Sequence, residues 1–150
     1  MNELDQMYQQ IILDAARERS GEGPLADAHG ESFQVNPTCG DQAWVRVKLS
    51  EDGTSLAELA WEGQGCSISQ ASLSIMSDLV EGKTLAEIGE LYTAFRDMMD
   101  KQGGTLTDEE ADLLEDASAF EGVSKFPMRI KCALLGWMGL RDAIDQAEVK

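Results

Sequence analysis

The sequence predicts an α+β fold, in which a small antiparallel sheet of about three strands packs against several helices. Two observations carry this prediction. Apolar and polar residues alternate only between residues 33 and 62, which is typical of short strands, whereas helical spacing of apolar residues dominates most of the remainder. No internal repeat or linker divides the chain, so we expect a single domain over residues 1–150.

Composition and charge exclude some classes of function. Twelve Lys and Arg oppose 28 Asp and Glu, giving a net charge of −16, and such a surface repels phosphate backbones, so we expect no nucleic-acid partner. The simplest interpretation is that the acidic surface aids solubility, and the alternative is that it docks on a basic face of a partner. Because the sequence has neither a basic apolar leader nor a membrane-spanning apolar run, we expect a soluble, cytoplasmic protein without a membrane partner.

The first segment has the pattern of an amphipathic helix, with apolar residues at helical spacing and mostly polar residues on the other face. The apolar residues are Leu4, Met7, Tyr8, Ile11, Ile12 and Ala15. The helix should end near Ser20, because Gly21-Glu22-Gly23-Pro24 breaks the pattern.

Two strands follow, and Asp52-Gly53 predicts a tight hairpin turn between them, since this pair tolerates positive φ angles. A short strand around Phe33–Val35 should lie alongside. Each of the two paired strands has one apolar face. These faces consist of Ala43, Val45, Val47 and Leu49 in the first strand, and of Ala57, Leu59 and Trp61 in the return strand over Leu56–Glu62.

Four further helices are predicted after the strands. The first covers residues 67–80, where apolar residues form a stripe. Thr84 should cap a helix that reaches about Lys101, and Thr107 should cap a shorter acidic helix. Each of these threonines is followed three residues later by a glutamate, which completes a capping box. Pro127 suits the first turn of the last helix.

The cysteines and the histidine limit the possible chemistry. Cys39, Cys66 and Cys132 are odd in number and widely separated, which is poor material for a disulfide framework and favours a reducing compartment. His29 is the only histidine, so a zinc site built on several histidines is excluded, and His29 is most simply a surface residue.

The residues around the cysteines nevertheless suit a metal. In Asn36-Pro37-Thr38-Cys39-Gly40-Asp41, a thiol and a carboxylate two residues apart can converge on one ion. Cys66 follows a glycine turn at the start of a helix, and Cys132 lies early in the last helix. Three thiolates and one carboxylate would satisfy the four-coordinate preference of zinc. Spacing alone leaves three alternatives open, namely structural cysteines, a metal site, or separate reactive thiols.

The same three motifs resemble the ligand loops of the IscU/NifU-like scaffold superfamily. Asn36–Asp41 resembles the first loop, Gly65–Ser72 the second loop with its following helix, and Lys131-Cys132 the third ligand position. The resemblance covers nearly the whole chain. It implies a SufE/NifU-like fold and a metal site whose ligands are Cys39, Asp41, Cys66 and Cys132.

Within this superfamily the chain is similar to the SufU type. The general scaffold branch has a histidine immediately before the third cysteine, where this chain has Lys131. That branch also has a Leu-Pro-Pro-Val-Lys chaperone motif, where this chain reads Phe126-Pro127-Met128-Arg129-Ile130-Lys131. The stretch around residues 98–118 looks like the insertion typical of SufU-type proteins. These features favour sulfur transfer over cluster building.

The resemblance implies a zinc-dependent sulfur-transfer protein with one zinc per chain. It would accept persulfide sulfur from a PLP-dependent, SufS-type cysteine desulfurase, activate that enzyme, and supply the downstream iron–sulfur assembly machinery. Cys39 is the implied sulfur carrier, replaced on zinc during docking by a group from the desulfurase. Asp41, a hard oxygen ligand among sulfurs, would help to keep the site exchangeable. Whether such a sulfur acceptor counts as an enzyme stays open.

Two other functions are compatible with the same residues. The ligands could hold a [2Fe–2S] cluster transiently, so that the chain is an assembly scaffold, or the zinc could be purely structural. Arg129 is a candidate for steadying the thiolate or for docking, and a plain surface salt bridge is an equal alternative.

Overall fold

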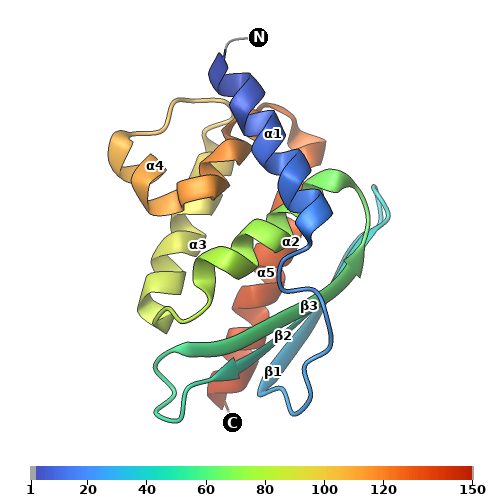
Figure 1. The fold of residues 1–150 in the computed structure, drawn as a ribbon, viewed down its shortest axis with the longest axis vertical. Helices are drawn as coiled ribbons and strands as arrows, with labels where there is room; N and C mark the ends of the chain where they lie inside the picture. The colour runs from blue at the N-terminus through green and yellow to red at the C-terminus, as the bar shows by residue number, and fades with distance from the viewer. Residues whose placement is uncertain (1–2, 150) are drawn as a thin grey trace.

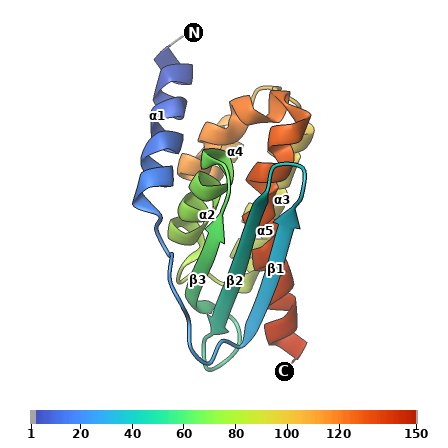
Figure 2. The ribbon, with the colours of Figure 1, turned by 90° about the vertical axis from the view of Figure 1, so that its right-hand side faces the viewer.

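The structure, a computed structural model, describes residues 3–149 and has a three-stranded antiparallel sheet with helices on one face (Figures 1 and 2). The elements in chain order are α1 (Glu3–Glu18), β1 (Gly30–Asn36), β2 (Asp41–Leu49), β3 (Leu56–Gln64), α2 (Ser67–Val80), α3 (Leu85–Asp100), α4 (Asp108–Leu114), the 3-10 helix η1 (Glu115–Lys125) and α5 (Pro127–Val149). The predicted α+β class and the antiparallel sheet are confirmed. Within residues 3–149, no helix is both long and apolar enough to cross a membrane.

The strands lie in the order β1-β2-β3, and burial alternates along β2 as predicted. Val45 pairs with Trp61, and both side chains are fully buried on the face that the helices cover. On the open face, Phe33 and Trp44 pair across β1 and β2 with ring centroids 4.7 Å apart. The sheet is therefore buried on one side only, as the alternating pattern requires.

The connection between β2 and β3 is longer than the predicted tight turn. It spans residues 50–55, where the Ser50 N–H donates to the Ser55 carbonyl (2.8 Å) and the Asp52 carboxylate accepts from the Thr54 N–H (3.1 Å). Gly53 has the expected positive φ (+74°). A register shift between Lys48 and Leu49 changes which residue faces the core at this end of the sheet.

This register shift contradicts one predicted position. Leu56, the first residue of β3, is fully buried, whereas Ala57 is exposed, although the alternation placed Ala57 on the apolar face. Leu59 and Trp61, beyond the irregularity, face the core as predicted.

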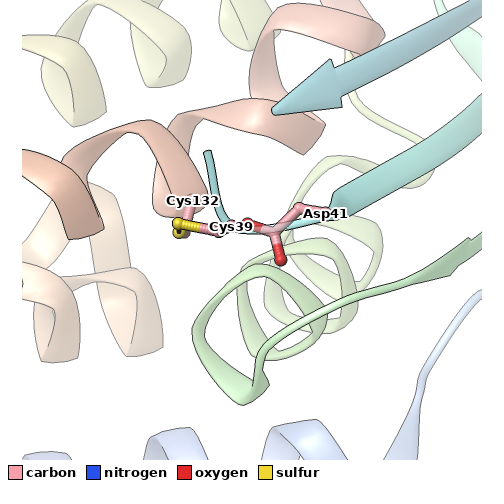
Figure 3. Close-up of side chains that lie close together, drawn as sticks. All are labelled: Cys39, Asp41 and Cys132. Atoms are coloured by element: carbon pink, nitrogen blue, oxygen red, sulfur yellow. Dashed lines mark hydrogen bonds between the residues drawn. The ribbon is translucent and has the colours of Figure 1, made fainter. Parts of the chain in front are cut away.

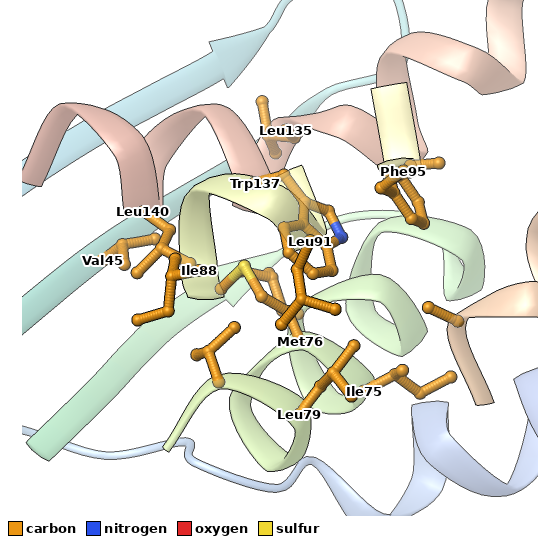
Figure 4. Close-up of a cluster of buried hydrophobic side chains, with 14 of the residues drawn as sticks. Val45, Ile75, Met76, Leu79, Ile88, Leu91, Phe95, Leu135, Trp137 and Leu140 are labelled. Atoms are coloured by element: carbon orange, nitrogen blue, oxygen red, sulfur yellow. The ribbon is translucent and has the colours of Figure 1, made fainter. Parts of the chain in front are cut away.

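The core lies between the sheet and the helices. α5 runs behind β1 and β2, and α2 lies beside α5 and contacts β3 (Figure 2). Phe95 of α3 stacks on Trp137 of α5 with ring centroids 5.0 Å apart, within the cluster drawn in Figure 4. Leu91 of α3 and Met76 of α2 belong to the same buried cluster. This packing fixes α2 and α5, the two helices that carry Cys66 and Cys132 near their starts.

The predicted apolar face of α1 is buried only in part. Ala15 is buried and Ile11 and Ile12 pack against the core, but Leu4 and Met7 are 47% and 51% exposed. The C-terminal half of α1 lies against α2, whereas its N-terminal half extends away from the sheet (Figure 1). The periodicity therefore predicts the helix correctly but overestimates how much of it is covered.

Both predicted capping boxes are present. The Thr84 hydroxyl accepts from the Glu87 N–H at the start of α3, and the Thr107 hydroxyl accepts from the Glu110 N–H at the start of α4. η1 has no counterpart among the predicted elements, because its small and polar residues form no stripe at helical spacing. Residues 98–118 contain the end of α3, α4 and the start of η1, and that they form an insertion stays a prediction.

Candidate metal centre

The turn between β1 and β2 presents Cys39 and Asp41. Asn36 and Asp41 are opposite each other in the ladder, so residues 37–40 form the tip of a hairpin. Cys39 is exposed on this tip, where its N–H donates to the Asn36 carbonyl (3.3 Å). Asp41 is fully buried as the first residue of β2. The hairpin thus places a solvent-exposed thiol next to a buried carboxylate.

Cys132 approaches this turn from α5. Its side chain is buried, and its sulfur lies 3.4 Å from the Cys39 sulfur (Figure 3). The Asn36 amide donates to the Cys132 sulfur at 3.8 Å. One ligand atom each from Cys39, Asp41 and Cys132 lie within 4.8 Å of one another. Two strands and the last helix therefore bring together three of the four predicted ligands.

Cys66 adjoins this group on the Asp41 side. It is the N-cap of α2, and its N–H donates to Asp41 Oδ1 (2.8 Å) while its sulfur lies 3.8 Å from Asp41 Oδ2. Its thiol is exposed and lies outside the cluster of three, so Cys66 as the fourth ligand stays a prediction.

Gly65 makes the contact between Cys66 and Asp41 possible. Its φ of +150° is one that side-chain-bearing residues rarely adopt. A Cβ at this position would also lie 2.2 Å from Asp41 Oδ1. The glycine before Cys66 is therefore required both by its backbone conformation and by the space that the carboxylate occupies.

The donor set fits a cation such as zinc. Burial raises the pKa of the Cys132 thiol, and hydrogen bonds with the side chains of Asp41, Cys39 and Cys66 raise it further, because these groups resist another negative charge. A bound cation reverses this preference by compensating the charge of thiolates and carboxylate together. Three sulfurs and one carboxylate oxygen match the ligands and coordination number that zinc takes in proteins.

Asn36, Ser69 and Gln70 contact the site residues, although the sequence assigned no role to their side chains. Ser69 Oγ lies 3.3 Å from Asp41 Oδ1, and Gln70 Nε2 donates to Ser69 Oγ (3.2 Å). All three are buried polar residues beside the ligands. Their nearness in sequence to Cys39 and Cys66 is a signal, but periodicity alone does not predict that these side chains point at the ligands.

His29 and Arg129 lie outside the ligand cluster. His29 is exposed at the other end of the sheet, where its Nδ1 accepts from the Leu49 N–H (2.9 Å), so it is a surface residue as predicted. The Arg129 guanidinium lies 4.8 Å from the centre of the Phe126 ring. The role of Arg129, in steadying the thiolate, in docking or in a plain surface salt bridge, stays a prediction.

This arrangement of two strands and a helix around paired cysteines occurs in a known family. Residues 7–144 match the family described as the NifU-like N-terminal domain. The chain belongs to the NifU-like N-terminal domain family. The resemblance found in the cysteine motifs is thereby confirmed.

Two relatives of this NifU-like chain have names that state different functions. The zinc-dependent sulfurtransferase SufU of Bacillus subtilis (strain 168) is 39% identical over 145 residues, which cover 97% of this chain and 94% of SufU. The iron–sulfur cluster assembly scaffold protein IscU of Streptococcus pyogenes serotype M1 is 36% identical over 148 residues, which cover 98% of this chain and 88% of IscU.

Solved structures share the fold. The N-terminal part of a nitrogen-fixing NifU-like protein from Brucella abortus superposes with a TM-score of 0.83 at 27% identity, covering 97% of both chains. The SufU protein of Fervidobacterium islandicum AW-1 gives a TM-score of 0.80 at 30% identity, covering 90% of this chain and 94% of that one. The sheet and helices described above are thus those of the NifU-like family.

Proposed function

We propose that this chain is a zinc-dependent sulfur-transfer protein, which accepts persulfide sulfur from a PLP-dependent, SufS-type cysteine desulfurase for iron–sulfur cluster assembly. The observation that carries the proposal is the contrast between the thiols. Cys39 is exposed on a hairpin tip. Cys132 is buried in α5, and Cys66, although exposed, is held at the N-cap of α2 by its N–H bond to Asp41. A sulfur carrier needs one thiol that a partner can reach and others that keep the site together.

Cys39, Asp41, Cys66 and Cys132 would hold one zinc ion. When bound, zinc keeps coordinating thiols deprotonated near neutral pH. Asp41 and Cys132 are held by β2 and α5, and Cys66 is fixed through its N–H bond to Asp41. Among the described residues, the Cys39 sulfur has one hydrogen-bond contact, with the Cys132 sulfur. Cys39 is therefore the ligand that can leave the set with the least disturbance.

The transfer step is a thiol–disulfide type exchange. The Cys39 thiolate attacks the outer sulfur of the desulfurase persulfide, so that a new S–S bond forms on Cys39. The S–S bond within the desulfurase persulfide breaks, and its electron pair leaves with the desulfurase cysteine as a thiolate. No external oxidant or reductant is consumed, and the product is a persulfide on Cys39.

The compartment follows from the same geometry. The sulfurs of Cys39 and Cys132 are only 3.4 Å apart, so oxidation would join two of the ligands in a disulfide and remove them from the metal. A reducing compartment avoids this loss, and we place the protein in the cytoplasm.

An assembly scaffold for a [2Fe–2S] cluster is the second candidate, supported by the sulfur-rich ligand set and by the name of the IscU relative. The two functions differ in what they require of Cys39. Sulfur transfer needs its thiol to leave the other ligands, whereas a scaffold needs all the ligands to stay together.

The test is to mix the protein with a SufS-type desulfurase and cysteine, without added reductant. We expect faster desulfurase turnover and, by mass spectrometry, a persulfide on Cys39. Cys39→Ser should lose both effects, because a hydroxyl cannot carry the sulfur, whereas Thr38→Ala, an exposed change in the same turn, should retain them. If Cys39→Ser still accelerates the desulfurase, sulfur transfer through Cys39 is wrong and the scaffold function leads.

A further inference from the structure

A chain of buried polar side chains extends from Asp41 to the end of the N-terminal helix. Ser69 Oγ lies 3.3 Å from Asp41 Oδ1, and Gln70 Nε2 lies 3.2 Å from Ser69 Oγ. The Gln70 Oε1 atom accepts from Arg19 Nη1 at 2.7 Å. Asp41, Ser69 and Gln70 are each at most 4% exposed, so water does not replace these hydrogen bonds.

The chemistry of the four groups gives this chain of hydrogen bonds one direction. The Arg19 guanidinium can only donate, so the oxygen of the Gln70 amide must face it. The amide nitrogen of Gln70 then faces Ser69 and donates to its oxygen. The single hydroxyl proton of Ser69 is left for its two acceptors, Asp41 Oδ1 and the Cys66 carbonyl (3.0 Å). When this proton turns to Asp41, the charged acceptor of the two, every step delivers a donor toward the carboxylate.

Arg19, the first member, is held firmly in place. It follows α1 with a φ of +48°, and its Nη2 donates to the Gly63 carbonyl at 3.0 Å. Its guanidinium lies 4.9 Å from the centre of the Trp61 ring and pairs with Glu22. These contacts tie Arg19 to β3 and to the loop after α1. The direction of the hydrogen bonds from Arg19 to Ser69 therefore does not depend on a mobile side chain.

The two oxygens of Asp41 consequently have different surroundings. Oδ1 accepts from the Cys66 N–H (2.8 Å) and lies within reach of the Ser69 hydroxyl. Oδ2 faces the Cys66 sulfur at 3.8 Å. The carboxylate lies at the first turn of α2, as Figure 3 shows.

We propose that Arg19, Gln70 and Ser69 form a positioning relay that fixes Asp41 through Oδ1 and leaves Oδ2 to bind the metal. This inference rests on the metal site of the proposed function. Side chains that orient a metal ligand in this way commonly change metal affinity by about 10- to 100-fold when they are removed. The relay makes the N-terminal segment part of the metal site, although none of its residues is a ligand.

The first test compares two serines on α2. Ser69→Ala removes the donor to Asp41, whereas Ser72→Ala removes an equally buried hydroxyl that donates to the Ala133 carbonyl (2.6 Å). With a chromophoric chelator as competitor, we expect zinc affinity to fall about tenfold in Ser69→Ala and to stay within about twofold of wild type in Ser72→Ala. We also expect the d–d bands of bound Co²⁺ to shift only in Ser69→Ala. Equal zinc affinities for the two variants would overturn the relay.

The second test reverses the hydrogen-bond direction at Gln70. In Gln70→Glu the carboxylate still accepts from Arg19, but it cannot donate, so the Ser69 proton turns toward it and away from Asp41. Simple electrostatics predicts tighter zinc binding from the added negative charge, whereas the relay predicts binding about tenfold weaker. Tighter binding would overturn the relay.

Failure of the relay can be distinguished from failure of the metal site. Zinc binding by the wild type that is lost in Cys132→Ala supports the site itself. If the wild type binds zinc and both Ser69→Ala and Gln70→Glu bind it as tightly, the relay is wrong and the site stands. The melting temperature of each metal-free variant serves as the control for folding.

Discussion

At the residue scale, the metal centre depends on a buried carboxylate and on the residues that make room for it. Burying Asp41 is costly unless its oxygens are hydrogen-bonded and its charge is compensated. The Cys66 N–H supplies one hydrogen bond, and Gly65 supplies the space. A cation at this site would compensate the charge of the buried acid.

Gly65→Ala should therefore damage both stability and metal binding. The new Cβ meets Asp41 and the backbone has φ +150°, so we expect a loss of about 1–3 kcal/mol in the free energy of unfolding and weaker zinc binding. Gly53→Ala is the matched control, because Gly53 also has positive φ but its Cβ would meet nothing within 4 Å. Urea unfolding and zinc titration check the pair. Unchanged zinc affinity in Gly65→Ala would contradict the close approach of Gly65 to Asp41.

Cys66→Ala and Cys132→Ala should each lose zinc. Binding to the folded state stabilises it, so zinc should raise the melting temperature of the wild type and have little effect on either variant. The measurement is zinc content by elemental analysis, with melting curves in the presence of zinc and of a chelator. We expect about one zinc per wild-type chain. A full complement of zinc in both variants would mean that the ligands are misassigned.

The candidate ligands are the part of the site that sequence predicts best. Cys39, Asp41 and Cys132 come together, as the resemblance of their three motifs to a metal-binding family implies. The environment of these ligands is harder to predict. Ser69 and Gln70 are ordinary polar residues on a helix, and only the fold decides that they face Asp41. Their role depends on where their side chains point in the folded protein, which sequence spacing does not give.

At the element scale, the helices that have local sequence signals with a direct physical cause were predicted correctly. α2 spans Ser67–Val80 as its apolar stripe predicts, and α3 and α4 begin at their capping threonines. The errors arise where tertiary packing decides the outcome. Sequence cannot show that Leu4 and Met7 of α1 stay exposed, or that a bulge after Lys48 moves Leu56 into the core.

The start of α4 leads to a prediction about pH. The Lys101 ammonium (2.6 Å) and the Thr107 N–H (3.0 Å) donate to Glu110 and lower its pKa to about 2. Because the folded pKa is below the unfolded value of about 4.3, this carboxylate stabilises the fold above that value, and its contribution is lost as pH falls toward 2. The difference in unfolding free energy between wild type and Glu110→Gln should therefore shrink from pH 7 to pH 3.

Urea unfolding at each pH measures this difference. Glu109→Gln is the control, since it removes one negative charge from the same first turn without removing the bonds to Lys101 and Thr107. A gap between wild type and Glu110→Gln that is equal at pH 7 and pH 3 would show that these hydrogen bonds do not hold the carboxylate ionised.

At the scale of the whole molecule, charge is the dominant surface property. The net charge is −16, and ion pairs engage Glu22, Glu31, Glu62 and Glu110. Most of the 28 acidic side chains therefore contribute to a negative field around the protein. The stretch just before Cys132 departs from this pattern, because Lys125, Arg129 and Lys131 are all exposed there.

The acidic surface has a testable role in docking. If it steers the chain toward a basic face of a cysteine desulfurase, salt should weaken the association, because exposed charges are screened beyond about 10 Å at roughly 0.1 M ionic strength. We expect the dissociation constant to rise on the order of tenfold between low and high salt, mostly through slower association. Surface plasmon resonance over a series of NaCl concentrations measures both quantities. Melting curves over the same series provide the control: screening a net charge of −16 reduces self-repulsion, so the melting temperature should not fall as salt rises. An affinity that stays flat across the series would show that the charge serves solubility alone and that docking depends on apolar contacts.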